Sequence, residues 1–239
     1  MRPRRRKGII LGRTRFKESS IIVRCLLEDG SIVSLLFKGA LRSRSRVSAQ
    51  LMPFALIEFV FYEKPERAVQ TASEALVIED YSAPLRDYES QSRISKYLHK
   101  VEDVIKPGQS VPELFDITLA IMRQWEILTR IDDEILWTGF LLKVMTFSGF
   151  APSIFVCSSC NGELPGEGVI PFSPSSGGFL CNQCAKPEDV IWTSVYVLKL
   201  LRFLLENPFP AYEKMSKRKS DVKKAREIME KFWNYYVGE

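Results

Sequence analysis

Four cysteines with the spacing of zinc ligands are the strongest chemical signal in this sequence. Cys157 and Cys160 form one Cys-x-x-Cys pair, and Cys181 and Cys184 form a second pair after twenty intervening residues. A tetrahedral zinc ion takes four thiolates at about 2.3 Å, and a Cys-x-x-Cys turn presents two sulfurs on one side of the ion. The glycines and prolines between the pairs favour tight turns joining short strands. The pattern predicts one structural Zn²⁺ ion held by all four cysteines.

Three other kinds of cysteine chemistry compete with this interpretation. Structural disulfides need an oxidising compartment. A redox-active Cys-x-x-Cys would normally open a helix within a βαβ unit, and no such pattern surrounds either pair. A catalytic zinc site usually has about three protein ligands and one open position, whereas four cysteines close the site. The zinc is therefore expected to hold a small subdomain together rather than to recognise a ligand directly.

The composition is ordinary for a soluble globular protein, with 239 residues of which 46 % are hydrophobic and 26 % charged. This length suits one large core or two modest cores. No run of 18 apolar residues occurs, and the basic N-terminus lacks the apolar stretch of a secretory signal. We expect a cytoplasmic protein with no membrane contact and reduced thiols. Cys25 lies in an apolar run and is expected to be a buried hydrophobic residue.

The net charge of +5 conceals an asymmetry along the chain. The first fifty residues carry thirteen basic and three acidic residues, a balance of +10, and the remainder carries 21 basic and 26 acidic residues, a balance of −5. A basic region facing a mildly acidic remainder indicates a polyanionic partner for that region.

The first eighty residues have the pattern of a small β-barrel. β-branched runs are separated by turn residues, including Asp29-Gly30 in a hairpin, and a helical period is absent. Five short strands are predicted, over residues 8–14, 19–27, 32–37, 53–62 and 69–80. An OB-type barrel is the economical interpretation, and such barrels bind single strands with a basic groove and aromatic platforms.

The loop at residues 38–46 alternates arginines with small residues and has no evident apolar anchor. A charge run alone is usually a solvated, mobile loop, but here a second basic run precedes the first strand of the same predicted domain. Arginine presents a planar donor fork to phosphate, so the two runs together predict nucleic-acid contact. The candidate phosphate contacts are Arg2, Arg4, Arg5, Arg6, Lys38, Arg42, Arg44 and Arg46. Phe16 or Phe37 could stack a base, although a strand aromatic is more often part of the core.

From residue 83 onward the apolar period becomes helical. Asp132 is expected near the start of a helix that is apolar nearly all round. Helices are predicted over 85–105, up to about 129, over 135–147, over 195–205 and over 222–236. The fold class is therefore α+β and multidomain. It has an OB-fold DNA-binding domain at 1–80 and a helical domain at 81–239, with a Cys₄ zinc module at 153–190 inserted in the helical domain.

No catalytic machinery is visible in the sequence. A phosphate-binding Gly-x-x-x-x-Gly-Lys-Ser/Thr loop, a Gly-x-Ser-x-Gly elbow and a His-x-Glu segment are all missing. The single histidine, His99, reads as an ordinary residue on or near a helix surface. We therefore expect a protein that is not an enzyme.

Four stretches together resemble the RecO family of bacterial recombination mediators: residues 8–19, 38–46, 148–160 and 172–184. The most specific features are Gly-Phe-Ala-Pro at 149–152 leading to Cys157, and Phe-Ser-Pro at 172–174 leading to Cys181. The resemblance runs from the first strand to beyond Cys184. One departure is Ser20, where the family often has aspartate.

The resemblance implies an N-terminal OB domain, a helical domain and a zinc module between helices. It implies binding of single- and double-stranded DNA, annealing of complementary strands, and help in replacing single-strand-binding protein with the recombinase, without nucleotide hydrolysis. The implied partners are RecR and the acidic, apolar-tipped C-terminal tail of single-strand-binding protein, and the implied location is the bacterial cytoplasm near the nucleoid. Because not all members keep the cysteines, the resemblance implies that zinc is a brace.

Two hypotheses from other classes remain beside the DNA-repair mediator. One is a non-enzymatic adaptor whose helical domain recruits proteins and whose basic N-terminus is incidental. The other is an RNA-binding protein that combines an OB barrel with a zinc ribbon, for which the 2′-hydroxyl would be the means of discrimination.

Overall fold

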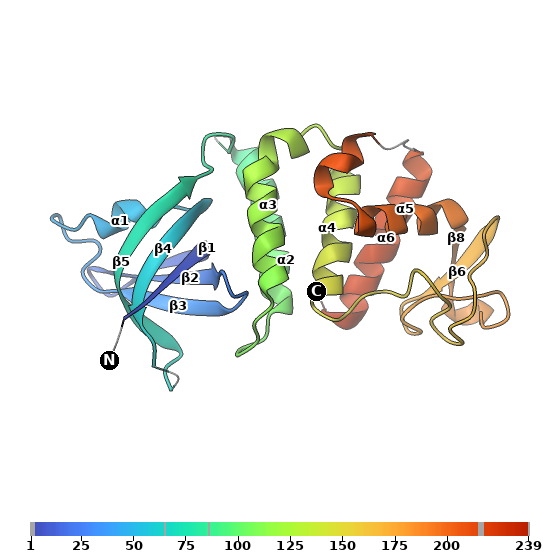
Figure 1. Cartoon of the computed structure of the whole chain (residues 1–239), viewed down its shortest axis with the longest axis horizontal. Helices are drawn as coiled ribbons and strands as arrows, with labels where there is room; N and C mark the ends of the chain where they lie inside the picture. Colours follow the sequence, from blue (N-terminus) through green and yellow to red (C-terminus); the bar gives the residue numbers. More distant parts are fainter. Residues whose placement is uncertain (1–2, 65, 86, 215–217, 239) are drawn as a thin grey trace. The chain divides into compact units, whose positions relative to one another are not determined.

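The computed structural model describes residues 3–64, 66–85, 87–214 and 218–238. The chain forms two compact units, Met1–Trp125 and Glu126–Glu239, whose boundary lies within a helix. Figure 1 shows the β-strands of the N-terminal region in blue and teal, and the helices and small sheet of the C-terminal region in yellow to red. The division into domains of residues 1–80 and 81–239, with a module at 153–190, stays a prediction.

The first unit contains a closed five-stranded barrel. Its strands are β1 (Arg4–Phe16), β2 (Ser20–Leu27), β3 (Ile32–Phe37), β4 (Ala55–Tyr62) and β5 (Val69–Asp80). The order around the barrel is β1-β2-β3-β5-β4, and β3 and β5 form a parallel pair while the other neighbours are antiparallel. This is the five-stranded Greek-key arrangement of the OB fold, so the predicted fold class is confirmed. The one-turn helix α1 (Val47–Gln50) between β3 and β4 was not predicted.

Strand β1 begins at Arg4, four residues before the predicted start at Gly8. Residues 4–9 pair with β4, and residues 8–16 pair with β2, with a register shift between Ile10 and Gly12. The prediction that the first basic run precedes this strand was wrong for residues 4–7. A strand tolerates charged residues when their side chains reach solvent, as those of Arg4 and Arg5 do. Strand β1 therefore pairs with both β2 and β4, and these two pairings close the barrel.

The barrel interior is filled by one apolar residue from every second position of each strand. Phe37 packs against Phe59 with ring centroids 6.3 Å apart. Cys25, as predicted, is buried with 0 % exposure. The other fully covered members of this core include Ile21, Val23, Leu35, Leu51, Ala55 and Ile57.

The hairpin between β2 and β3 packs against the connection between α2 (Tyr88–Val104) and α3 (Pro112–Leu128). Gly30 has a φ of +78°, and a Cβ added there would lie 2.0 Å from the carbonyl carbon and oxygen of Val111. The Ser110 hydroxyl donates to the carbonyl of Asp29. Glycine is therefore required at position 30 both by the turn and by the close approach of a second backbone.

Strand β5 is joined to α3 by a small polar cluster. The Arg123 guanidinium donates to both carboxylate oxygens of Glu79, at 3.1 and 2.5 Å, and to the Tyr81 hydroxyl at 3.2 Å. Hydrogen bonds from Arg123 and Tyr81 hold the pKa of Glu79 below its usual value. This bidentate contact fixes the end of the barrel wall against the helix.

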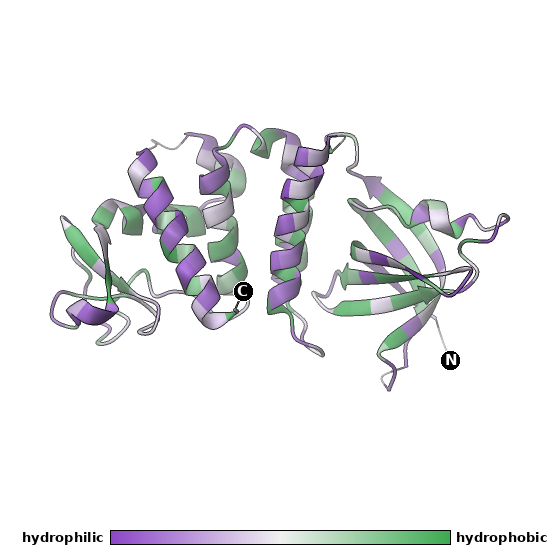
Figure 2. Cartoon of the chain, turned by 180° about the vertical axis from the view of Figure 1, so that it is seen from behind, coloured by the Kyte–Doolittle hydropathy of each residue, from purple (hydrophilic) through white to green (hydrophobic). Residues whose placement is uncertain are grey.

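The second unit is built on three helices that pack on one another: α4 (Asp133–Phe147), α5 (Val195–Glu206) and α6 (Lys219–Tyr236). Asp132 caps α4, as its position predicts, by accepting hydrogen bonds from the backbone of Glu134 and Ile135. Helix α4 is buried on most sides, and Figure 2 shows it largely green, whereas α6 carries hydrophilic purple residues along much of its length. No helix among the described residues combines the length and apolar character needed to cross a membrane.

The cysteine-bearing segment follows α4 in the chain and precedes α5. It contains a three-stranded sheet of order β7-β6-β8, formed by β6 (Val169–Ser173), β7 (Gly178–Phe179) and β8 (Ile191–Ser194). Phe172 of β6 packs against Phe179, with centroids 4.9 Å apart, and against Phe232 of α6 at 5.7 Å. The sheet therefore shares an aromatic core with the last helix.

The contact at Gly30 leads to a stability prediction. Gly30→Ala should lower the free energy of unfolding by about 2 kcal/mol or more, because the new Cβ meets the Val111 backbone and the φ is left-handed. The matched control is Gly12→Ala, since no atom lies within 4 Å of a Cβ added at Gly12. Urea unfolding of both variants measures the difference, and equal midpoints would contradict the role given to Gly30.

Candidate metal centre and nucleic-acid interface

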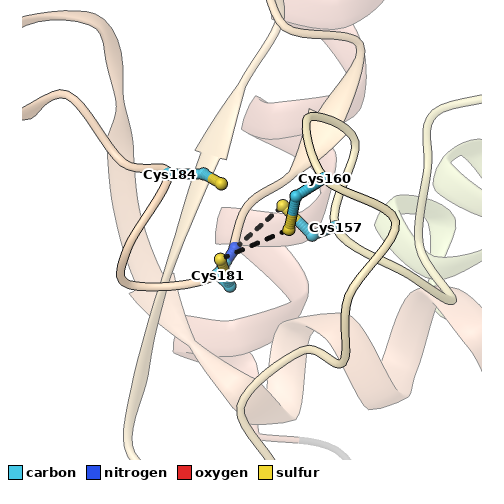
Figure 3. A group of neighbouring side chains, drawn as sticks. All are labelled: Cys157, Cys160, Cys181 and Cys184. Carbon is cyan, nitrogen blue, oxygen red and sulfur yellow. Dashed lines mark hydrogen bonds between the residues drawn. The ribbon is translucent and has the colours of Figure 1, made fainter.

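The four cysteines that the spacing singled out come together in space. The sulfurs of Cys157, Cys160, Cys181 and Cys184 all lie within 4.8 Å of one another, and the sulfurs of Cys160 and Cys181 are 3.9 Å apart. Figure 3 shows the two pairs facing each other from two separate loops. Four sulfurs around a tetrahedral ion with bonds of about 2.3 Å would be about 3.8 Å apart. The donor set and its geometry therefore fit a metal ion, and within the described residues this is the one such cluster of cysteine, histidine and acidic side chains.

Backbone hydrogen bonds shape both loops. In the first loop the Asn161 amide donates to the Cys157 carbonyl at 2.9 Å, and Asn161 has a left-handed φ of +58°. In the second loop the Cys184 amide donates to the Cys181 carbonyl at 3.1 Å. The loops are joined by the Cys181 amide, which donates to the sulfur of Cys157 at 3.3 Å, and this contact is one of those drawn as dashed lines in Figure 3. Thiolates accept such bonds well, so the backbone is arranged for charged sulfurs.

The electrostatics of the cluster differ between its members. Burial alone would raise the pKa of Cys157, but backbone amides including those of Cys160 and Cys181 lower it to about 6. The pKa of Cys184 is raised to about 12 by its contacts with the thiols of Cys181 and Cys160. Four crowded thiols cannot all ionise without a compensating cation, and a bound metal ion supplies that charge.

Cys25 takes no part in this cluster. It lies in the barrel core of the first unit, and burial raises the pKa of its thiol. Its behaviour is that of a small hydrophobic residue.

The predicted phosphate contacts of strand β1 are divided between two sides of the strand. Side chains alternate along a strand, so Arg4 and Arg6 share one side and Arg5 lies on the other. Arg4 is paired with Glu63 at 2.7 Å and Arg5 with Glu58 at 2.7 Å. Arg6 is half-buried, and Arg2 lies outside the described residues. The structure therefore does not gather the first basic run into one patch.

The loop after β3 presents its basic residues to solvent. Lys38, Arg42, Arg44 and Arg46 are all exposed. The loop has more anchorage than the sequence indicated, because Ala40 is buried with 2 % exposure and the Leu41 amide donates to the Ser19 carbonyl at 2.9 Å. This bond places the start of the loop beside the turn between β1 and β2.

Arg46 and Arg5, from separate basic runs, meet at one surface hollow. They line a cavity of about 280 Å³ on the outside of β4 and β5. Glu58 and Glu74 line the same cavity, so its charge is mixed.

The two aromatic candidates have different environments. Phe37 has 2 % exposure and belongs to the barrel core, whereas Phe16, the last residue of β1, has 38 % exposure. The Lys17 ammonium lies 5.5 Å from the centroid of the Phe16 ring. Phe16 therefore sits on the surface at the turn to which the arginine loop is tied.

Sequence reasoning missed a groove in the second unit, between α5 and α6. It has a volume of about 380 Å³, and its lining includes the apolar residues Leu200, Phe203 and Val222 together with the acidic residue Asp221. At its edge the Arg218 guanidinium stacks on the Tyr196 ring at 4.2 Å, and the Lys199 ammonium lies 5.8 Å from the same ring. A sign of this groove was present in the sequence as a basic run that includes Lys214, Arg218 and Lys219. The run was overlooked because residues 51–239 taken together have a net negative charge.

Comparison with known proteins gives matches over most of the chain. Family models described as recombination protein O N terminal and recombination protein O C terminal match residues 1–81 and residues 99–239. The DNA repair protein RecO of Rubrobacter xylanophilus is 29 % identical over 182 residues, which cover 75 % of this chain and 71 % of that protein. The DNA repair proteins RecO of Alkaliphilus metalliredigens and Listeria monocytogenes are each 27 % identical. The Alkaliphilus match covers 87 % of this chain and 83 % of the relative, and the Listeria match covers 82 % and 74 %.

Proposed function

Because the chain belongs to the recombination protein O family, we propose that it is a recombination mediator in DNA repair. It binds single- and double-stranded DNA, anneals complementary strands, and assists loading of the recombinase onto DNA coated by single-strand-binding protein. The observation that carries this proposal is the OB barrel with an exposed arginine loop tied to its β1–β2 turn. The protein acts without catalysing a reaction of its own, in the cytoplasm near the nucleoid.

DNA contact is assigned to the basic residues of the barrel. Annealing requires neutralisation of two polyanions without sequence readout, which arginines directed at phosphates supply. Arg42, Arg44 and Arg46, with Lys38, are the main contacts because they are exposed. Arg4 and Arg5 also contribute. Their surface ion pairs with Glu63 and Glu58 are worth about 0–1 kcal/mol each, so phosphate readily replaces those carboxylates.

The ion of the cysteine cluster is zinc, bound by Cys157, Cys160, Cys181 and Cys184. Four thiolates in a closed tetrahedral set are typical of structural zinc rather than of a catalytic site. The sheet that the ion stabilises packs on α6 through Phe172 and Phe232. The zinc is thus a brace for the second unit and does not read DNA.

Two protein partners complete the proposal: RecR, and the acidic, apolar-tipped tail of single-strand-binding protein. The α5–α6 groove suits the tail. Its apolar lining accepts the apolar end of a peptide. Lys199 and Arg218 attract the carboxylates of the peptide and outnumber Asp221, which lines the same groove.

Charge reversal of the arginine loop tests the DNA site. Replacing Arg42, Arg44 and Arg46 with Glu should weaken single-stranded DNA binding and slow annealing of complementary strands. The slope of log affinity against log salt should fall by about 2, since each phosphate contact contributes about 0.7 on a single strand. The measurement is annealing of two oligonucleotides, one coated with single-strand-binding protein, across a salt series without ATP.

The matched control replaces Lys106, Lys186 and Lys223 with Glu, which changes the net charge equally at exposed positions elsewhere. If the control and the loop variant lose equal affinity, the loop is not the site. A wild-type protein that anneals at no salt concentration would favour the adaptor hypothesis, and strong preference for RNA of the same sequence would favour the RNA-binding hypothesis.

Metal analysis of the purified protein should find one zinc per chain. Cys160→Ser and Cys184→Ser should lose the ion, whereas Cys25→Ala should keep it.

Chelation should lower the free energy of unfolding of the second unit by about 3 kcal/mol or more. DNA affinity should change little, since the basic loop is in the first unit. Loss of DNA binding in a folded, zinc-free protein would contradict the role of a brace.

The groove is tested with an acidic peptide that ends in an apolar residue. Lys199→Glu combined with Arg218→Glu should weaken binding about tenfold, because two attractive contacts become repulsive. The control combines Lys223→Glu with Lys231→Glu, which lie on α6 but do not line the groove. Fluorescence anisotropy of a labelled peptide measures both, and equal affinities of the two variants would exclude this groove.

A further inference from the structure

A five-residue segment projects from the barrel between two apolar anchors. Leu41 and Val47 both pack against the barrel core. The residues between them, which we call the Arg-Ser segment, are Arg42, Ser43, Arg44, Ser45 and Arg46. The Ser45 amide donates to the Arg42 carbonyl at 2.9 Å, which closes a β-turn with Ser43 at its first corner. The fold thus holds the segment at both ends and leaves its middle exposed to solvent.

The arginines of this segment have no carboxylate partners. Arg4 and Arg5 of β1 are paired with glutamates at 2.7 Å, whereas no ion pair in the part of the chain that the structure describes involves Arg42, Arg44 or Arg46. One reason is local, since no aspartate or glutamate occurs at residues 30–57. Positive charge on this segment is therefore not neutralised by its own neighbours in the sequence.

Acidic side chains do approach one end of the segment. Glu58 and Glu74 line the same hollow as Arg46. Their charge makes that end the less favourable one for an added anion. Arg42 and Arg44 are exposed, and they are the guanidiniums most available to a phosphate.

Two serines alternate with these arginines, and the structure distinguishes them. Ser43 and Ser45 are the only serines of the chain with arginine on both sides. Ser43 is exposed, whereas Ser45 is half-buried. Ser48, the next serine along the chain, uses its hydroxyl to accept a hydrogen bond from Arg13 at 3.0 Å. Ser43 is therefore the hydroxyl of this loop that another enzyme can reach.

A phosphate on Ser43 would meet the same groups that the loop offers to DNA. A phosphoserine carries a charge of about −1.5 to −2 at pH 7 and three acceptor oxygens, and it pairs with nearby arginines. The four basic side chains at positions 38, 42, 44 and 46 give the loop a charge of +4, which one phosphate would lower to about +2. A guanidinium that holds this phosphate is not available to a phosphate of DNA.

We propose that Ser43 is a phosphorylation site, and that its phosphate binds Arg42 and Arg44 and so prevents the loop after β3 from binding DNA. The Ser43 hydroxyl oxygen forms a bond to the γ-phosphorus of a nucleoside triphosphate. The bond from that phosphorus to the bridging oxygen breaks, the nucleoside diphosphate leaves with the electron pair, and the hydroxyl proton passes to a base of the kinase. The enzyme is a serine kinase that recognises arginine beside the acceptor. This inference rests on the proposed function and adds a means of regulating it.

The effect on DNA is tested with protein that carries phosphoserine in place of Ser43. Its affinity for single-stranded DNA should fall about tenfold or more. The slope of log affinity against log salt should fall by about 1.4, because two arginines are withdrawn and each phosphate contact contributes about 0.7. Ser43→Ala should bind as wild type does. The matched control carries phosphoserine in place of Ser220, an exposed serine beside Lys219 on α6, and its affinity should change less than twofold.

A second measurement detects capture of the phosphate without DNA. The second pKa of a phosphoserine is about 6, and nearby guanidiniums lower it because they favour the dianion. Phosphorus NMR titration of the Ser43 phosphoprotein should therefore give a pKa below that value. Arg42→Gln combined with Arg44→Gln should return the pKa to about 6.

The choice of serine is tested with ATP and a serine kinase that selects arginine-flanked acceptors. Mass spectrometry should find the phosphate on Ser43. Ser45→Ala should be modified as wild type is, whereas Ser43→Ala should be modified at less than a tenth of that level. Modification of Ser45 in preference to Ser43 would overturn the assignment.

The outcomes separate this inference from the proposed function. If wild-type protein binds DNA and the Ser43 phosphoprotein binds it equally well, the switch is wrong and the mediator function stands. Equal losses from the phosphates at Ser43 and Ser220 would also overturn the switch, because they would indicate a general effect of charge. A phosphate pKa that does not respond to loss of Arg42 and Arg44 would exclude capture by these arginines. If wild-type protein binds no DNA, the proposed function fails and the switch fails with it.

Discussion

Pairing of one long strand with two neighbours is the constraint on which the N-terminal unit depends. Strand β1 bonds to β4 through its first half and to β2 through its second half, with a register shift where the partner changes. A closed sheet leaves no unpaired edge, so both the basic residues of β1 and the loops at its ends acquire fixed positions. The Ser19 carbonyl, in the turn after β1, accepts a hydrogen bond from the Leu41 amide. This bond anchors the arginine loop. The positions of the basic residues on the barrel surface therefore depend on how the strands pair to close the barrel.

The basic residues of the barrel occupy several surfaces rather than one groove. Those on β1 point to both sides of the strand, and two of them already have carboxylate partners at 2.7 Å. Those of the loop after β3 are exposed. Such a distribution suits a ligand whose charge is spread along a flexible backbone, because exchange of one surface ion pair for another changes the free energy little. It would suit poorly a ligand that must be read at defined base edges.

Local pattern predicted most of the fold. Strand periods located the five barrel strands, and the Asp132 cap located the start of α4, because these signals depend on neighbours in the sequence. The cysteine spacing predicted the cluster because each Cys-x-x-Cys turn presents two sulfurs on one side of an ion. Features that depend on distant contacts were not accessible. The sequence could not distinguish exposed Phe16 from buried Phe37. It also could not show that Gly30 meets the backbone of Val111. The start of β1 was predicted four residues too late. A run of arginines has no strand signal of its own, and residues 4–7 are in the strand because they pair with β4.

The aromatic contact between Phe172 and Phe232 has a consequence for how the protein is made. Phe172 lies on the sheet beside the cysteine loops, and Phe232 lies on α6, near the end of the chain, sixty residues later. During synthesis the four cysteines leave the ribosome well before α6 does. A nascent chain can therefore gather its thiols, and a metal ion with them, while one side of the small sheet is still without its covering helix. Emergence of α6, rather than emergence of the last cysteine, is therefore the step that allows this unit to become fully packed.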